Sequence, residues 1–184
     1  MKELSLNILD IAQNSIKAEA SLVEIYIDEA NAWLTLIIKD NGYGMSEAFL
    51  REVCDPFSTT RTTRKVGLGI PLLKLAAEQT GGTLSITSVT AEADKEHCGT
   101  TVRATFFEGH LDFTPLGDVV STVVMLLLGS PDVDFVFRHT TDKGVVELDT
   151  RQMREILGDE VPLNDPSVLE WAKESLMDQY NSTR

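Results

Sequence analysis

The spacing of hydrophobic residues changes several times along the first 107 residues of the chain. Over residues 4–18 the apolar side chains recur at helical spacing, which predicts an amphipathic helix. Residues 22–28 and 31–39 alternate apolar and polar side chains, which predicts two strands joined by a short turn and therefore antiparallel. The same reasoning gives a short helix over 47–53, a helix from about 66 to 80, and strands over 83–89 and 100–107.

The C-terminal region, residues 109–184, has regular elements of its own. Asp118 is suited to cap an apolar helix that runs to about residue 128. Apolar alternation on both sides of residues 142–144 predicts a hairpin. Two further helices are expected near 150–158 and 166–179.

The order of these elements predicts an α/β (α+β) two-layer sandwich, with helices on one face of a largely antiparallel mixed sheet. We place a domain boundary at the change of character after Phe107, which gives a first domain of residues 1–108 and a C-terminal α+β extension. The extension is the more acidic part, with 14 acids and 6 bases, and it carries no catalytic motif.

The overall charge narrows the classes of partner. The 184 residues carry a net charge of -13, so no basic surface is expected for nucleic acid or for anionic lipid. The longest apolar stretch, residues 119–128, is too short to span a bilayer, and no metal-binding cysteine pattern surrounds Cys54 or Cys98. We therefore expect a soluble, cytoplasmic protein that has neither a membrane nor a nucleic acid as its partner.

Polar residues form an arc on the first helix. At 100° per residue, Asn7, Asp10, Asn14 and Lys17 fall together on one side. A solvated helix face would also place polar residues there. However, asparagine is a poor choice for the middle of a helix, which favours a functional reason for its presence.

A second candidate stretch, Asp40-Asn41-Gly42-Tyr43-Gly44-Met45, follows the strand over 31–39. A carboxylate at a strand end, followed by two spaced glycines, lets the backbone turn sharply and leaves room for a ligand. The alternative is an ordinary turn, because Asn-Gly is a common turn dipeptide.

Two more segments complete the set. Residues 57–65 are hydroxyl-rich and basic without an apolar period, which indicates a loop, and Gly67-Leu68-Gly69 then opens a helix. Gly99-Thr100-Thr101 leads into the strand over 100–107.

Taken in order, these motifs resemble the ATP-binding domain shared by sensor histidine kinases, MutL-type mismatch repair proteins, type II topoisomerases and Hsp90-class chaperones (the GHKL or Bergerat fold). The resemblance covers residues from about 3 to 107. It is closest to the histidine kinase branch, because Pro56-Phe57-Ser58-Thr59-Thr60-Arg61 is similar to a lid segment of nitrogen-regulator-type sensor kinases. Lys17 has a kinase-like placement as well.

The resemblance implies ATP and Mg²⁺ as cofactors and assigns roles around the base. Asp40 would accept a hydrogen bond from the adenine amino group. Gly42 and Gly44 would let the backbone pass close to the base, and Met45 would cover it. Thr100 and Thr101 match the family's Gly-Thr pair near the adenine.

Other residues would serve the phosphates. Asn14 matches the magnesium ligand, an amide oxygen suited to a hard cation. The segment Gly67-Leu68-Gly69 would place backbone N–H groups and a helix N-terminus against the phosphates. Residues 59–65 would form a lid, in which Thr59, Thr60, Arg61, Arg64 and Lys65 are available to the nucleotide.

The chain also departs from the family pattern. The kinase lid usually has a glycine where this chain has Lys65. No paired dimerisation helices with a phospho-accepting histidine come before the first helix, and His97, His110 and His139 are not in such a context, so autophosphorylation on histidine within this chain is not expected. We expect His97 and His139 to be surface or strand-end residues.

Asp10 stands where ATP-hydrolysing relatives usually carry a glutamate general base, and it is our candidate catalytic residue. Two functions remain open. The first is a histidine-kinase-like or serine-kinase-like phosphotransferase or slow ATPase that acts with a partner protein. The alternative is a nucleotide-gated, anti-sigma-like interaction module with little turnover.

Overall fold

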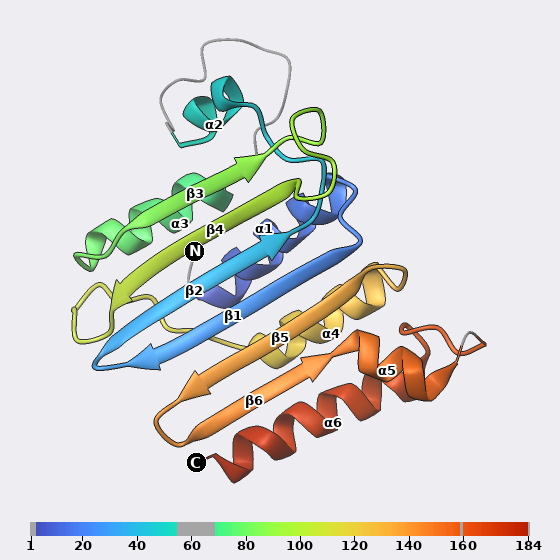
Figure 1. The fold of residues 1–184 in the computed structure, drawn as a ribbon. Coiled ribbons are helices and arrows are strands. Elements are labelled where there is room, and N and C mark those ends of the chain that lie inside the picture. The colour runs from blue at the N-terminus through green and yellow to red at the C-terminus, as the bar shows by residue number, and fades with distance from the viewer. Residues whose placement is uncertain (1–2, 55–68, 159, 184) are drawn as a thin grey trace.

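The computed structural model describes residues 3–54, 69–158 and 160–183 of the chain. Its centre is a six-stranded sheet with the strand order β3-β4-β2-β1-β5-β6 (Figure 1). Every neighbouring pair in this sheet is antiparallel except β1 and β5, which run parallel. The prediction of a largely antiparallel mixed sheet in an α+β fold is confirmed.

The described elements follow the predicted order closely. The helices are α1 (Leu4–Lys17), α2 (Glu47–Cys54), α3 (Gly69–Gln79), α4 (Val119–Gly129), α5 (Thr150–Leu157) and α6 (Pro166–Ser182). The strands are β1 (Leu22–Ala30), β2 (Trp33–Asp40), β3 (Leu84–Val89), β4 (Gly99–Phe107), β5 (Asp134–Thr141) and β6 (Gly144–Asp149).

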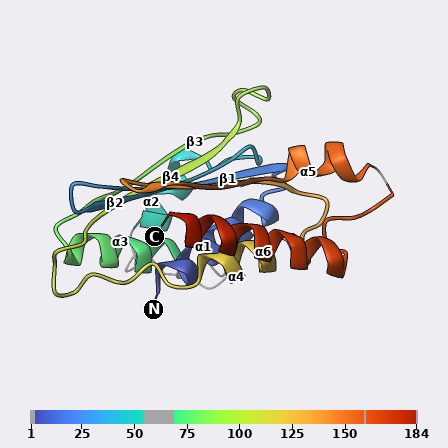
Figure 2. The same cartoon turned by 90° about the horizontal axis from the view of Figure 1, so that it is seen from below.

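Most of the helices form one layer against the sheet. Helices α1, α3, α4 and α6 lie together on one side of the sheet, as Figure 2 shows, whereas α5 lies on the other side. Alternate side chains of the central strands are buried under the helices, for example Ile25 and Ile27 on β1 and Leu36 and Ile38 on β2. The alternation found in the sequence therefore marks the face of the sheet that carries the core.

The C-terminal region adds to this same sheet. Strand β5 pairs with β1 along its length, from Leu22 opposite Asp134 to Asp28 opposite Thr140. The chain before α4 also holds the start of α1, since the N–H groups of Leu4 and Ser5 donate to the carbonyls of Pro115 and Leu116 at 2.9 and 2.8 Å. These first N–H groups have no partner within the helix, so the C-terminal region supplies one.

Helix α5 is attached to the start of β5 by a small polar network. The hydroxyl of Thr150 accepts from the N–H of Phe135 at 2.8 Å and donates to Asp134 at 2.9 Å. Arg154 donates to the same Asp134 carboxylate at 2.8 Å and to the carbonyl of Pro131 at 2.6 Å. Each of these polar groups is satisfied by another group of the C-terminal region.

Candidate functional site

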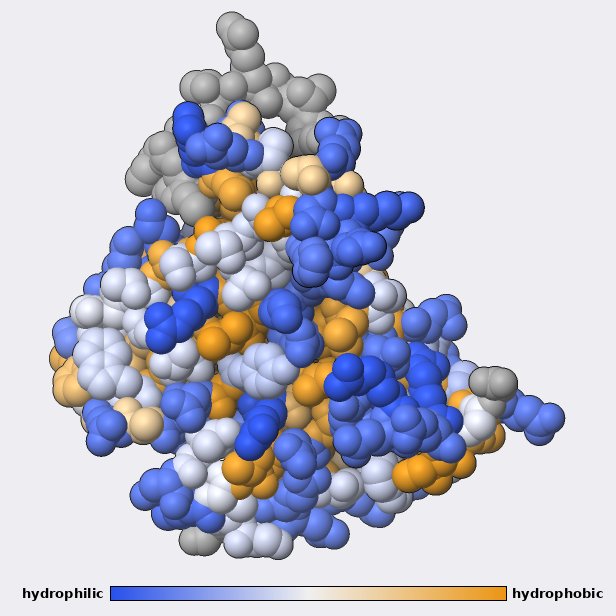
Figure 3. Space-filling view, in the orientation of Figure 1, coloured by the Kyte–Doolittle hydropathy of each residue, from blue (hydrophilic) through white to orange (hydrophobic). Residues whose placement is uncertain are grey.

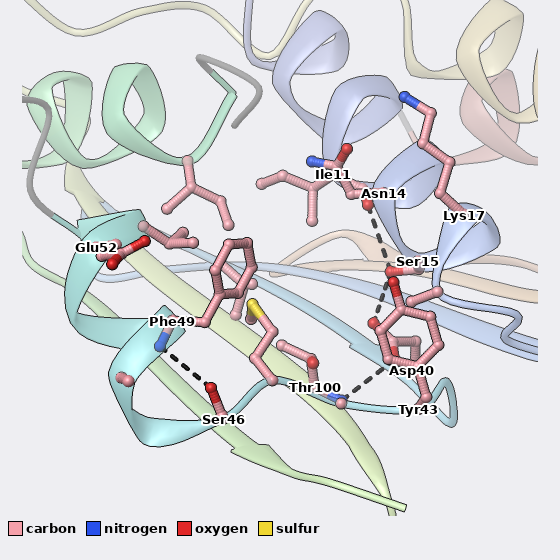
Figure 4. Close-up of a pocket in the computed structure, with 17 residues that line it drawn as sticks. Ile11, Asn14, Ser15, Lys17, Asp40, Tyr43, Ser46, Phe49, Glu52 and Thr100 are labelled. Atoms are coloured by element: carbon pink, nitrogen blue, oxygen red, sulfur yellow. Dashed lines mark hydrogen bonds between the residues drawn. The ribbon is translucent and has the colours of Figure 1, made fainter. Parts of the chain in front are cut away.

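An open cavity of about 1020 Å³ lies beside α1 and α2, where β2 ends and β4 begins (Figure 4). Its polar lining brings together Asn14, Ser15 and Lys17 of α1 with Asp40 of β2 and Thr100 of β4. Its apolar lining comes from both layers: Ile11, Ala18, Met45, Ala48, Phe49, Val53, Ile70 and Val102. Residues that are far apart in the sequence therefore share one hollow with an apolar wall and a polar wall.

Asp40 is held in this cavity by three hydrogen bonds. It is the last residue of β2 and only 9% of it is exposed. Its Oδ1 accepts from the N–H of Gly42 at 3.0 Å and from the N–H of Thr100 at 3.2 Å. Its Oδ2 accepts from the hydroxyl of Ser15 at 2.6 Å. Three donors from three segments thus fix the orientation of one buried carboxylate.

Ser15 is a site residue that the sequence reasoning missed. Its hydroxyl lies beside Asp40, to which it donates, and it is also within 3.3 Å of the carbonyl of Ile11 (Figure 4). A serine in the middle of a helix is usually explained by such a bond to the preceding turn. The available signal was its position beside Asn14 on the same helix, but its partner lies 25 residues away.

The loop after β2 leaves no space for side chains at its two glycines. Gly44 has a φ of +73°, and a Cβ there would lie 2.0 Å from the carbonyl oxygen of Val89. A Cβ on Gly42 would lie 2.6 Å from the carbonyl oxygen of Ala18, whose oxygen also accepts from the N–H of Tyr43 at 2.9 Å. The glycines therefore let this loop pack directly on α1 and on the end of β3.

Two hydroxyl groups, on β3 and β4, hold the loop after β2 at Met45. The N–H of Met45 donates to the hydroxyl of Ser88 at 2.8 Å, and that hydroxyl lies 2.8 Å from the hydroxyl of Thr100. Both Met45 and Thr100 line the cavity. Thr101 does not line it, because successive side chains of β4 point to opposite faces of the sheet.

Other residues proposed from the sequence lie at or beyond the cavity edge. Asp10 is exposed and is not a lining residue, but it lies beside the start of α3, where a Cβ on Gly69 would come within 3.1 Å of its own Cβ. The proposed contributions of Thr59, Thr60, Arg61, Lys65, Gly67 and Leu68 lie outside the described residues.

The three histidines lie outside this cavity. His97 is an exposed residue of the β3–β4 loop, and its Nδ1 lies 3.0 Å from Asp94, as expected for a surface residue. His139 differs from the expectation, because it continues the buried phase of β5 and is only 4% exposed. Its Nδ1 lies 2.8 Å from the hydroxyl of Tyr180, and its Nε2 lies 3.1 Å from Glu29. The expectation of a surface or strand-end histidine is wrong for His139.

Sequence comparison adds independent information about this region. A family model described as "Histidine kinase-, DNA gyrase B-, and HSP90-like ATPase" matches residues 2–110, which is more than half of the chain. A candidate sensor protein from Shewanella frigidimarina is 29% identical over 107 residues, and a candidate NtrY-like sensor histidine kinase from Rickettsia conorii is 27% identical over 93 residues. These segments are 58% and 50% of this chain but only 15% of each relative.

Structural similarity extends further along the chain than sequence similarity. The ATPase domain of Aquifex aeolicus MutL, solved with ADP, superposes with a TM-score of 0.55 at 13% identity and covers 95% of this chain and 88% of the MutL chain. The shared fold thus includes most of the C-terminal region, beyond the limit of the family model. No helix in the described ranges is both long and apolar enough to cross a membrane. The family model covers more than half of the chain, and part of the motif set lines one cavity, so the chain belongs to the family of histidine kinase-, DNA gyrase B- and HSP90-like ATPases.

Proposed function

We propose that this protein binds Mg-ATP in the cavity around Asp40 and acts in the cytoplasm with a partner protein, as a phosphotransferase or a slow ATPase. The observation that carries the proposal is the orientation of the Asp40 carboxylate by Gly42, Thr100 and Ser15. Family membership and the ADP-bound MutL relative support the same ligand class.

The hydrogen bonds of Asp40 explain why adenine is the expected base. An ionised carboxylate has about four acceptor positions. Two bonds to Oδ1 and one to Oδ2 occupy three of them, so Oδ2 keeps one position for a donor. The amino group of adenine is such a donor. The carbonyl of guanine would face a carboxylate oxygen without a proton between them, which costs about 1–3 kcal/mol.

The rest of the cavity suits the remaining parts of the nucleotide. Met45, Phe49 and Val102 would offer an apolar wall to the base, while Asn14 and Lys17, which also line the cavity, would serve the phosphates. The start of α3 at Gly69 would direct N–H groups that have no acceptor within the helix toward that side. Within the described ranges, no three His, Cys, Asp or Glu side chains group as a metal site, so Mg²⁺ would depend on the Asn14 amide oxygen, the phosphates and water.

Asp10 is the residue proposed to act on the transferred group. It lies one helical turn before Asn14 and against the start of α3, which is where the phosphates would lie. In that place its carboxylate would accept the proton of an attacking water or partner hydroxyl, or orient a water on the metal. Its side chain would act on the partner from the exposed rim of the cavity.

A thermal shift experiment tests nucleotide binding. Mg-ATP should raise the melting temperature of the wild type more than Mg-GTP does, and ligand at about 100 times its Kd stabilises by about 2.7 kcal/mol. In Asp40→Asn the amide oxygen can still accept from Gly42 and Thr100, but the amide nitrogen replaces the acceptor offered to adenine. We expect this variant to fold and to lose about tenfold or more in ATP affinity.

Asp28→Asn is the matched control, because it removes the same charge from an exposed position on β1. It should leave the ATP shift unchanged. Equal shifts for wild type and Asp40→Asn, or no shift for either, would contradict the proposed site.

A second function is supported by the position of Asp10. Because its side chain is exposed and does not line the described cavity, the protein is also suited to act as a nucleotide-gated interaction module with little turnover. Purified protein, γ-labelled ATP and candidate partners distinguish the two. Phosphate release or labelled partner that is lost in Asp10→Asn supports the enzyme, whereas ATP-dependent partner binding that survives in Asp10→Asn supports the module.

A further inference from the structure

Helices α5 and α6 expose two large apolar side chains next to each other. Ile156 on α5 is 85% exposed and Trp171 on α6 is 54% exposed. Together with Met153, Leu157 and Val168 they line an apolar hollow of about 300 Å³, and Ser167 is the remaining lining residue. In Figure 3 an orange, hydrophobic area lies over α5 at the lower right, bordered by blue hydrophilic residues.

Trp171 also forms the wall of a second hollow. This second hollow, of about 480 Å³, continues along α6 past Glu174, Ser175 and Asp178 toward Val145 on β6. Residues 171, 174, 175 and 178 follow one stripe of the helix, because they are three or four positions apart. The two hollows share Trp171 as a wall, and we call the pair the α6 groove, with an apolar end at α5 and an acidic end beside β6.

The charged side chains around the α6 groove indicate that a partner bound there would be positively charged. Glu174 and Asp178 are exposed and line its acidic end. Both arginines of α5 already form ion pairs within the chain, since Arg151 pairs with Asp149 at 2.7 Å and Arg154 pairs with Asp134 at 2.8 Å. Lys173 lies on another side of α6, two residues from Trp171 and close enough to influence Asp118.

Part of the β6 backbone already has hydrogen-bond partners and is therefore not available to pair with a further strand. The side chain of Gln179 accepts from the N–H of Glu147 at 2.8 Å and donates to the carbonyl of the same residue at 3.1 Å. An added strand would have to displace both bonds. A partner in the α6 groove would therefore bind through side chains and not by extending the sheet.

We propose that the α6 groove is a docking site for a basic amphipathic segment of a partner protein. Such a segment places an aliphatic or aromatic anchor in the hollow between α5 and α6, and lysine or arginine side chains about one helical turn away, beside Glu174 and Asp178. A second copy of this chain fits poorly, because its net charge of -13 would bring acids to acids. The proposal does not depend on nucleotide binding, so the two can fail separately.

A random peptide library displayed on phage tests the groove directly. The library is selected on the full chain and depleted on Trp171→Ala, since a central exposed tryptophan is a typical hot spot. The enriched peptides should carry a hydrophobic anchor followed by Lys or Arg. Their affinity should fall by about tenfold or more in Trp171→Ala and should weaken as salt is raised.

A charge-reversal pair sharpens the result. The double variant Glu174→Lys plus Asp178→Lys should lose the basic peptides, while the control double variant Glu92→Lys plus Glu96→Lys makes the same charge change on the exposed β3–β4 loop and should keep them. If no enriched peptide depends on Trp171, or if the enriched peptides are not basic, the proposal is wrong. Dimerisation that sedimentation detects in the wild type and that Trp171→Ala abolishes would also overturn it in favour of self-association.

Discussion

The N-terminal and C-terminal regions both contain hydrogen-bonded polar groups, but they use them differently. In the N-terminal region Asp40 is fixed by three donors and still presents an acceptor to a cavity. In the C-terminal region Asp134 is bonded to Thr150 and Arg154, and His139 lies between Tyr180 and Glu29. The first arrangement leaves bonding capacity for a ligand, whereas the second uses it to hold the sheet together.

The difference shows that burial of a polar residue does not by itself mark a functional site. Asp40 and His139 are both nearly enclosed, at 9% and 4% exposure. Only Asp40 combines enclosure with a neighbouring hollow lined by residues from α1, α2 and β4. The C-terminal region instead has its unpartnered surface on the outside, in the α6 groove.

The largest effect is expected where the two regions share a core. Phe137 on β5 is buried, and Phe137→Ala should destabilise the protein by about 3–5 kcal/mol through lost packing and the cavity left behind. Urea unfolding can be followed in two backgrounds, Trp171→Phe, which leaves Trp33 on β2, and Trp33→Phe, which leaves Trp171 on α6. The unfolding transitions reported by Trp33 and by Trp171 should move to lower urea concentration together.

Val136→Ala is the control for that variant, because it truncates the next side chain on β5, which points to the opposite face. It should cost about 1 kcal/mol. The boundary at 108/109 stays a prediction, and this experiment tests it. If Trp33 kept its transition while Trp171 lost its own, residues 109–184 would be a separate folding unit.

The next largest effect concerns the loop after β2. Gly44→Ala forces a Cβ to within 2.0 Å of the Val89 carbonyl oxygen at a φ of +73°. We expect a loss of about 3 kcal/mol and weaker ATP binding, measured by thermal unfolding with and without Mg-ATP. Gly81→Ala has a similar φ of +78° and no atom within 4 Å of the new Cβ, so it should show the backbone cost alone, about 1 kcal/mol. Equal losses would show that the contact with β3 is unimportant.

The elements were predictable from the sequence, but one pairing was not. Alternation around residues 142–144 predicted the hairpin that the structure has as β5 and β6, because both strands are local in the sequence. The parallel pairing of β5 with β1 joins residues more than 100 positions apart. Periodicity shows which face of a strand is apolar, but it carries no information about which strand lies beside it.

Part of the cavity lining was predictable from the motifs, while the role of these residues in binding a nucleotide stays a prediction. Asn14, Lys17, Asp40, Gly44, Met45 and Thr100 meet at one cavity, as the motifs implied. Ser15 was missed because its partner is distant in the sequence and a helical serine has an ordinary explanation. His139 was misjudged although a signal was present, since Phe135, Phe137 and His139 share one alternation phase.

A smaller effect is expected when the orientation of Asp40 is disturbed and its charge is kept. Ser15→Ala removes the 2.6 Å bond to Oδ2 and leaves both backbone donors in place. We expect a fall in ATP affinity of about fivefold, equivalent to about 1 kcal/mol, in isothermal titration calorimetry. Ser182→Ala, which removes a helical serine bonded to the carbonyl of Asp178, is the control and should leave the affinity unchanged. A Ser15→Ala affinity equal to that of the wild type would mean that Gly42 and Thr100 orient Asp40 without help.

The smallest effect is expected at the polar contact that joins the two regions, where Glu29 of β1 meets His139 of β5, with Tyr180 and Glu108 nearby. The His139 side chain lowers the pKa of Glu29 below its ordinary value of 4.5. The folded state therefore binds fewer protons than the unfolded state, so the stabilisation is present above about pH 4.5 and is lost as pH falls through the folded pKa. Because Glu29 is partly exposed, Glu29→Gln should cost only about 0.5 kcal/mol at pH 7 and should flatten the loss of stability below about pH 5, measured by urea unfolding across pH. Glu92→Gln, exposed on the β3–β4 loop, is the control and should keep the wild-type dependence of unfolding free energy on pH. If Glu29→Gln also kept the wild-type dependence, the contact between Glu29 and His139 would contribute nothing to the joining of the regions.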